Sequence, residues 1–157
     1  MEKLQFQNAL RLSHVPRWVI VDMLKNQSVA DHTYRTMVIS LRLMKKLKVE
    51  ELPNILACIL IHDLEEAETG DLPSNHKTDM PKNGKCKDLQ EAVIKMADTV
   101  EATIWLERYG VRPGRIRRWL ESKLNFLTGE VNRFTLTPER SIMNAVNEII
   151  EEGSSYD

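Results

Sequence analysis

A histidine and an aspartate stand side by side at His62–Asp63, directly after the apolar run ILACILI of residues 55–61. Charge at the end of an apolar helix is costly to bury unless it is paired or binds a metal ion. Two further polar residues, His32 and Asp98, lie in segments with an apolar helical pattern. Two imidazoles and two carboxylates form a mixed donor set that suits a borderline divalent ion such as zinc, cobalt, manganese or iron. We therefore predict a metal site with ligands His32, His62, Asp63 and Asp98.

Each predicted ligand also has a purely structural interpretation. His32 alone could be a core histidine with satisfied hydrogen bonds, and Asp98 alone could form a salt bridge with Lys95 or Arg118. A His-Asp pair by itself occurs by chance in many chains. The placement of all four residues in apolar helical segments, three segments in total, favours the metal site because helices of a bundle can direct such groups to one point.

An acidic cluster follows the His-Asp pair. Glu66 lies four residues after His62, so both side chains are expected on one helix face. A carboxylate there could accept a proton from an attacking water. Glu65 falls off that face and is expected to be solvated.

Helical periodicity dominates the chain. Ser28 with Asp31 resembles a capping box, which predicts a helix start near Val29. Further helices are expected over 2–12, from Pro53 to before Gly70, over 88–109 with Gly110 as C-cap, around 116–124, and from Thr137 onwards. We predict an all-α fold, a helical bundle of about six helices in one domain of residues 1–157, with the metal site at its centre.

Apolar residues and cysteines give expectations for the core. Apolar residues cover most of the circumference of the helix that begins near Val29, which predicts a central, buried helix. Cys58 lies in the apolar run and is expected to be a small buried hydrophobe. Cys86 lies in a polar stretch, so no disulfide is expected and a reducing cytoplasm fits.

The bulk composition excludes several kinds of partner. The net charge is -1 and no basic stripe is visible, which argues against a surface for nucleic acid or anionic membrane. No run approaches the ~18 apolar residues of a membrane span. We therefore expect a cytoplasmic protein.

Three sequence motifs resemble those of a known family: SVADH (28–32), IHDLEEAETGDLP (61–73) and IKMADTVEA (94–102). They resemble the three blocks of the HD-domain metal-dependent phosphohydrolases. Within that superfamily, TGDLP and the upstream VPRW (15–18) are similar to the bacterial 5'-deoxynucleotidases and to their shorter phage relatives, the dATP triphosphohydrolases. The resemblance spans Val15 to Gly110.

The resemblance implies roles for individual residues. His32, His62, Asp63 and Asp98 match the metal ligands, and Glu66 matches the catalytic acid that orients the water. Arg17 matches an arginine that orients the substrate phosphate and assists catalysis, and Trp18 matches an aromatic residue that selects the 2'-deoxy sugar. The other implied substrate contacts are Ile20, Thr69, Asp71 and Lys77.

The physical chemistry of these side chains is compatible with those roles. Arginine binds a phosphate with two parallel hydrogen bonds. The lysines of the loop after the motif could attract a polyphosphate, although a solvated loop is the default interpretation. The resemblance implies a divalent metal cofactor, zinc or cobalt, with manganese or magnesium as further candidates.

Ile20 and the short chain favour the phage branch, in which an isoleucine at this place excludes a purine 2-amino group. The implied activity is hydrolysis of dATP, and also of dADP and dAMP, to deoxyadenosine and phosphates, which would deplete dATP in a phage that uses 2-aminoadenine. That branch tends to have a second proline after GDLP, where this chain has Asn75-His76. A broad-specificity 5'-deoxynucleoside monophosphatase is the alternative.

Two other functions of HD domains are alternatives. HD domains that hydrolyse guanosine tetraphosphate carry Glu-Asp at the fourth and fifth positions after the pair, but Ala67 follows Glu66 here. A non-catalytic nucleotide-binding HD module would usually have lost a ligand. The resemblance also implies a homo-oligomer, a dimer or a trimer of dimers, in which Ile116 and Trp119 could form an interface or simply cover the core.

Overall fold

The computed structural model describes residues 3–50, 52–70 and 85–155, and within these ranges the chain is helical with no β-strand. The described residues form six helices of seven or more residues, in line with the predicted number of about six, together with a single-turn helix and a short 3-10 helix. Their bounds are α1 Lys3–Arg11, η1 Leu12–His14, α2 Val29–Leu47, α3 Ile55–Ile61, α4 Glu66–Thr69, α5 Leu89–Tyr109, α6 Gly114–Thr135 and α7 Glu139–Ser154. The predicted all-α fold class is confirmed.

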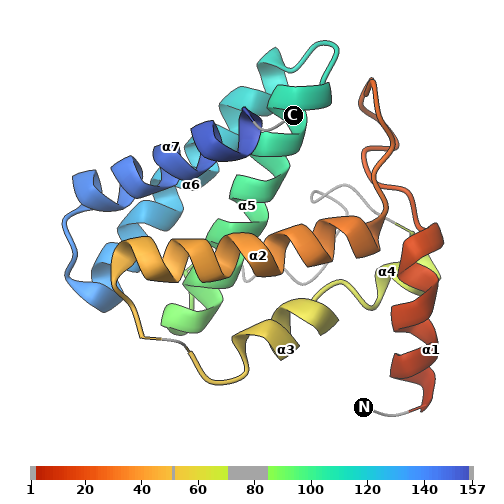
Figure 1. Cartoon of the computed structure of the whole chain (residues 1–157), viewed down its shortest axis with the longest axis horizontal. Coiled ribbons are helices and arrows are strands. Elements are labelled where there is room, and N and C mark those ends of the chain that lie inside the picture. Colours follow the sequence, from red (N-terminus) through yellow and green to blue (C-terminus); the bar gives the residue numbers. More distant parts are fainter. Residues whose placement is uncertain (1–2, 51, 71–84, 156–157) are drawn as a thin grey trace.

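Helix α5 is the centre of the bundle. It contacts α2, α6 and α7, and α2 lies across it (Figure 1). Apolar residues three or four positions apart form a buried stripe along it: Val93, Met96 and Val100 are fully inaccessible, and Ile104 is nearly so. Each such side chain contributes roughly 1.5–3 kcal/mol by leaving water. These residues therefore define the face of α5 against which the other core helices pack.

Helix α2 is not the fully buried central helix that its composition predicts. Its inner face is buried at Ile39, Leu43 and Met44, whereas Val38 and Leu41 are 50% and 43% exposed. The prediction was wrong because apolar residues on the outer face of α2 meet no other element in the described part of the chain. A helix packed on one side only exposes whatever its other side carries.

The start of α2 is set by its N-cap, as predicted. The Ser28 hydroxyl accepts a hydrogen bond from the Asp31 amide at 3.1 Å, which satisfies one of the free amides at the helix start. The segment before it folds back, because the Val29 amide donates to Val15 and the Arg17 amide donates to the Gln27 carbonyl at 2.8 Å. Arg17 and Trp18 are thereby held beside the first turn of α2.

The predicted continuous helix through His62 and Glu66 is interrupted. Helix α3 ends at Ile61, and the next amides bond three residues back, including Glu66 to Asp63 at 3.0 Å. Such 3-10 geometry has three residues per turn, so His62 and Glu66 do not share a face through regular α-helical spacing. Glu66 is nevertheless buried, at the first position of α4.

Cys58 is less buried than predicted, whereas Cys86, which lies in a polar stretch of the sequence, is buried. Cys58 is half-buried, because α3 buries only the face that carries Ile55 and Ile59. Cys86 packs into the hydrophobic core, and its amide donates to the Glu130 carboxylate at 2.7 Å while its carbonyl accepts from Arg133 at 2.8 Å. Both thiols are free, as predicted.

Gly110 caps α5, as predicted. Glycine is required there for a reason other than a left-handed backbone conformation. Its φ angle is -73°, which any residue adopts. A Cβ atom at this position would lie 2.6 Å from the Leu106 carbonyl oxygen, so close approach of the backbone requires glycine there.

Helix α3 leads directly into the His-Asp pair, so its packing can be tested with adjacent residues. Ile59 is fully buried and Leu60 is 40% exposed. Replacing Ile59 by alanine is expected to lower the free energy of unfolding by about 2–5 kcal/mol, whereas Leu60→Ala should change it by about 0.5 kcal/mol or less. Urea denaturation followed by circular dichroism measures both, and equal effects would contradict the burial of only one face.

No helix in residues 3–50, 52–70 or 85–155 combines the length and the apolar character that a membrane span requires.

Candidate metal centre

Three of the four predicted ligands meet in one cluster. The first turn of α2 supplies His32, and the turn after α3 supplies His62 and Asp63. One potential ligand atom of each lies within 4.8 Å of those of the other two. His62 Nε2 lies 3.1 Å and His32 Nε2 lies 3.7 Å from the same oxygen, Asp63 Oδ2. These residues could hold a metal ion.

Asp98, from the middle of α5, joins the cluster through His32. Its Oδ1 atom lies 2.9 Å from His32 Nε2, and its Oδ2 atom lies 3.6 Å from Lys123 Nζ. The alternative of a salt bridge with Lys95 or Arg118 was wrong, because the basic residue that pairs with Asp98 is Lys123, and Lys95 pairs with Glu91 at 2.7 Å. The structure therefore brings all four predicted ligands together from three helical segments.

The hydrogen bonds of the two imidazoles fit metal binding. His32 Nδ1 bonds to the Glu101 carboxylate at 2.6 Å, and His62 Nδ1 bonds to the Ile59 carbonyl oxygen. Since these acceptors hold a proton on Nδ1, the neutral form of each ring has its lone pair on Nε2. Both Nε2 atoms face carboxylates: His32 Nε2 lies 2.9 Å from Asp98 Oδ1, and His62 Nε2 lies 3.1 Å from Asp63 Oδ2. Two buried ring nitrogens directed at neighbouring carboxylates are what a metal site requires.

Electrostatics keep the metal-free site charged. Burial and the charge of Arg17 disfavour a protonated His32 ring, but Glu101 and Asp98 outweigh both and raise its pKa to about 9. Desolvation opposes ionisation of Asp98, yet the hydrogen bond with His32 and the charge of Lys123 hold the pKa of Asp98 well below its usual range. Burial also opposes ionisation of Asp63, but its contacts with His62 lower its pKa.

This charge state gives a pH dependence for metal loading. A divalent ion that binds His32 Nε2 must displace a proton whose pKa is raised to about 9, so the apparent affinity should rise by up to about tenfold per pH unit below that value and level off above it. In the metal-free protein the same shift stabilises the fold fully below the ordinary pKa of 6.5, and this contribution is lost as pH rises through about 9. Chelator competition from neutral pH upwards measures the first effect, and an affinity independent of pH would contradict it.

Arg17 reaches the metal cluster, whereas Trp18 contacts the residues beside it. The Arg17 guanidinium lies 3.7 Å from Asp63 Oδ2, and its side chain is 14% exposed. Trp18 has a φ angle of 62°, which is unusual for a residue other than glycine. Its indole Nε1 donates to Gln27 at 2.9 Å, while the ring packs against the cluster of Ala102, Leu106 and Leu120. A strained backbone that is held this firmly is typical of functional positions.

The other predicted substrate contacts that the structure describes are more exposed than Arg17 and Trp18. Ile20 lies in the segment after Trp18 and is 77% exposed. Thr69 ends α4, and its hydroxyl donates to the Glu65 and Gly70 carbonyls at 3.1 Å. Asp71 and Lys77 lie outside the described residues. Glu65 is exposed, as predicted.

Four residues near the cluster were not predicted: Gln27, Arg35, Glu101 and Lys123. Glu101 is fully buried and binds both His32 and Arg35. The available signal was an acidic residue three positions after a predicted ligand in an apolar helix, where i and i+3 share a face.

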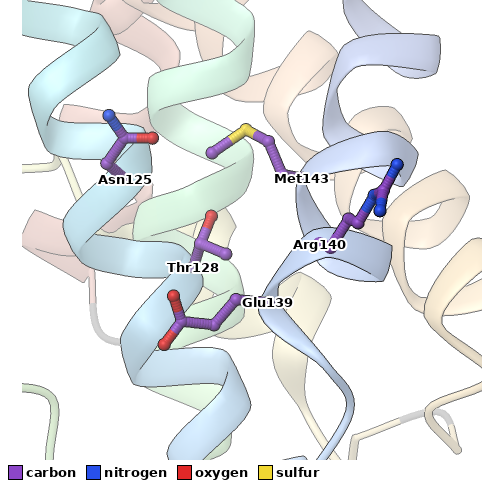
Figure 2. A pocket seen from close by; sticks show the side chains of 5 residues that line it. All are labelled: Asn125, Thr128, Glu139, Arg140 and Met143. Atoms are coloured by element: carbon purple, nitrogen blue, oxygen red, sulfur yellow. The ribbon is translucent and has the colours of Figure 1, made fainter.

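Two pockets in the described part of the chain lie away from the metal cluster, and the larger of the two, of about 350 Å³, is lined by residues of α5, α6 and α7. A shallow pocket of about 290 Å³ lies between α6 and the start of α7, lined by Asn125, Thr128, Glu139, Arg140 and Met143 (Figure 2). None of its lining residues is a histidine, a cysteine or a predicted substrate contact. Among the described residues, the group of histidine and carboxylate side chains that could hold a metal ion lies where α2, α5 and the turn after α3 meet.

A mixed His/Asp centre at the junction of buried helices defines a metal-binding helical domain, and comparison with known proteins specifies it. Residues 9–110 match the HD domain family. The chain therefore belongs to the HD domain family, and the predicted resemblance is confirmed.

Individual relatives come from phages. The dATP triphosphohydrolase of Acinetobacter phage SH-Ab 15497 is 32% identical over 152 residues, which cover 76% of this chain and 74% of the relative. The dATP triphosphohydrolase of cyanophage S-2L is 37% identical over 71 residues, which cover 44% of this chain and 41% of the relative.

A solved structure shares the fold. The HD phosphohydrolase DatZ of cyanophage S-2L, bound to dA and one catalytic Zn²⁺ ion, superposes with a TM-score of 0.76. The match covers 97% of this chain and 98% of DatZ, at 21% sequence identity. It shows that the whole helical arrangement is an HD-domain fold.

Proposed function

We propose that the protein is a metal-dependent phosphohydrolase that cleaves the 5'-phosphate ester of deoxynucleotides, with dATP as its main substrate and dADP and dAMP as further substrates. The observation that carries the proposal is the convergence of His32, His62 and Asp63 within 4.8 Å, with Asp98 beside them. The relatives named dATP triphosphohydrolase support the choice of substrate.

The roles of the protein groups follow from their positions. When bound, a zinc or cobalt ion would make water acidic and polarise the phosphoryl oxygens. Glu66, buried directly after the His-Asp turn, accepts the proton of the attacking water. Arg17, held beside Asp63, binds a phosphate oxygen and offsets its growing negative charge. Attack of the water on the α-phosphorus breaks the bond to the 5' oxygen, which takes up the proton and leaves as deoxyadenosine, and the phosphate chain is the other product.

Trp18 supplies the sugar selectivity in this proposal. Its ring is fixed on one side by the apolar cluster of α5 and α6 and at its Nε1 by Gln27. A ring held so rigidly leaves no room for adjustment, so a ribose 2'-hydroxyl placed against it would lose its hydrogen bonds. Thr69, Asp71 and Lys77 complete the proposed substrate contacts.

Product analysis tests the activity directly. The purified protein, loaded with zinc, cobalt, manganese or magnesium, is incubated separately with each dNTP, each dNMP and ATP. Deoxyadenosine from dATP, with ATP left intact, is the expected result. Equal turnover of all dNMPs would instead identify the broad-specificity monophosphatase, and binding without hydrolysis would identify a non-catalytic module.

The base preference has its own test at Ile20. If this side chain excludes the purine 2-amino group, Ile20→Ala should raise the rate with 2-amino-dATP relative to dATP by about tenfold or more. Val19, which is 68% exposed next to it, provides the matched variant Val19→Ala, for which no change is expected. The ratio of kcat/KM values measures the effect, and an unchanged ratio for Ile20→Ala would remove Ile20 from the proposal.

The setting of the enzyme is part of the proposal. We place it in the cytoplasm, in a host cell that makes 2-aminoadenine phage DNA, where it would deplete dATP without binding nucleic acid.

We also propose that the protein forms a dimer or a trimer of dimers. Trp119 of α6 supports an interface because it is 47% exposed, and sedimentation of the wild-type protein and of Trp119→Ala tests it.

A further inference from the structure

A buried carboxylate that the proposed reaction does not use lies behind the metal cluster. Glu101 is fully buried on α5, one turn after Asp98. Its Oε2 atom accepts from His32 Nδ1 at 2.6 Å. Its Oε1 atom accepts from Gln27 Nε2 at 2.8 Å and from Arg35 Nε at 2.7 Å. Three donors from the segment before α2 and from α2 itself therefore fix this one carboxylate.

The contact with His32 controls which nitrogen can bind a metal. A carboxylate offers only acceptors, so the Nδ1 atom that faces it carries the proton and Nε2 keeps its lone pair. His32 Nε2 is the atom that faces Asp63 and Asp98. Without the carboxylate, the ring could adopt the other tautomer or rotate, and the energy of either change would be lost from metal binding.

The same carboxylate is connected to the proposed sugar contact. Gln27 is 2% exposed. It donates to Glu101 through Nε2 and accepts the indole proton of Trp18 through Oε1 at 2.9 Å. The amide therefore has a single orientation that satisfies both bonds. Trp18, Gln27, Glu101 and His32 form one continuous chain of hydrogen bonds.

We infer that Glu101 is a positioning residue which sets the His32 tautomer for metal binding and, through Gln27, fixes the orientation of the Trp18 ring, the proposed sugar contact. This inference rests on the proposed function. It assigns two separable effects: the Glu101 contact with His32 governs metal affinity, and the Gln27 bridge governs affinity for the deoxynucleotide.

Metal affinity is the first readout, because it requires no turnover. In chelator competition, Glu101→Gln is expected to bind zinc about 10–100-fold more weakly than wild type. Glu130→Gln is the matched control, since Glu130 is also a buried carboxylate that accepts from an arginine and from a backbone amide. It should bind zinc like wild type. Equal affinity for Glu101→Gln and wild type would overturn the inference.

The Gln27 bridge is tested by Gln27→Met, which retains the length of the side chain and removes both hydrogen bonds. Zinc affinity should remain unchanged, while KM for dATP rises about fivefold or more. A loss of zinc affinity equal to that of Glu101→Gln, or an unchanged KM, would overturn the separation of the two effects.

A measurement on the wild-type protein protects against a variant that does not fold. In the zinc-loaded protein, NMR should detect a slowly exchanging Nδ1 proton assigned to the His32 ring, and a ring protonated at Nε2 instead would overturn the inference. The proposed function fails separately: weak zinc binding by Glu101→Gln together with no dATP hydrolysis by the wild type would support this inference and refute that function.

Discussion

Replacing Asp63 by asparagine is expected to abolish both metal binding and dATP hydrolysis. Asp63 Oδ2 is the atom on which the cluster converges, 3.1 Å from His62 Nε2 and 3.7 Å from His32 Nε2 and from Arg17. An amide has nearly the same shape but no charge, so it is a poor ligand for a divalent ion. We expect zinc affinity to fall by more than about 100-fold, beyond the loss typical of groups that only support a ligand.

The control for Asp63→Asn is Glu65→Gln, two positions along the same segment, where the side chain is exposed. It removes the same charge and should leave zinc binding and hydrolysis as in wild type. Metal content after dialysis and phosphate release are measured on both variants, and circular dichroism confirms that each is folded. Full activity of Asp63→Asn would refute the proposed centre.

Replacing Glu66 by glutamine is expected to reduce kcat by about 10²–10⁴-fold while zinc affinity stays within a factor of two or so. Glu66 is 4% exposed at the start of α4, directly after the ligand-bearing turn. Glutamine keeps the size and the hydrogen-bonding reach of the side chain but cannot accept a proton from water. The loss should therefore appear in the chemical step and leave the metal in place.

The combination of the two variants discriminates between roles. Asp63→Asn should lose metal and activity together, and Glu66→Gln should lose activity alone. If Glu66→Gln also lost the zinc, Glu66 would be a ligand and the water would need another base. If it kept its full kcat, general-base catalysis by Glu66 would be excluded.

The local sequence determined the type of fold and most of the candidate centre. Ser28 set the start of α2 through a hydrogen bond that spans three residues, and the three-and-four spacing of Val93, Met96, Val100 and Ile104 set the buried face of α5. His32, His62, Asp63 and Asp98 were recognisable because polar groups are rare in apolar helices. These features could be predicted since periodicity and capping act over one or two turns.

Tertiary structure alone decided which helix is central and which groups support the ligands. Periodicity marks an apolar face but does not specify what covers it, so α2 and α5 could not be ranked from composition, nor could Cys58 and Cys86. The contact between His32 and Glu101 joins residues 69 positions apart and exists only because α2 lies across α5. Side-chain partners of this kind depend on packing between elements, which no local pattern of residues encodes.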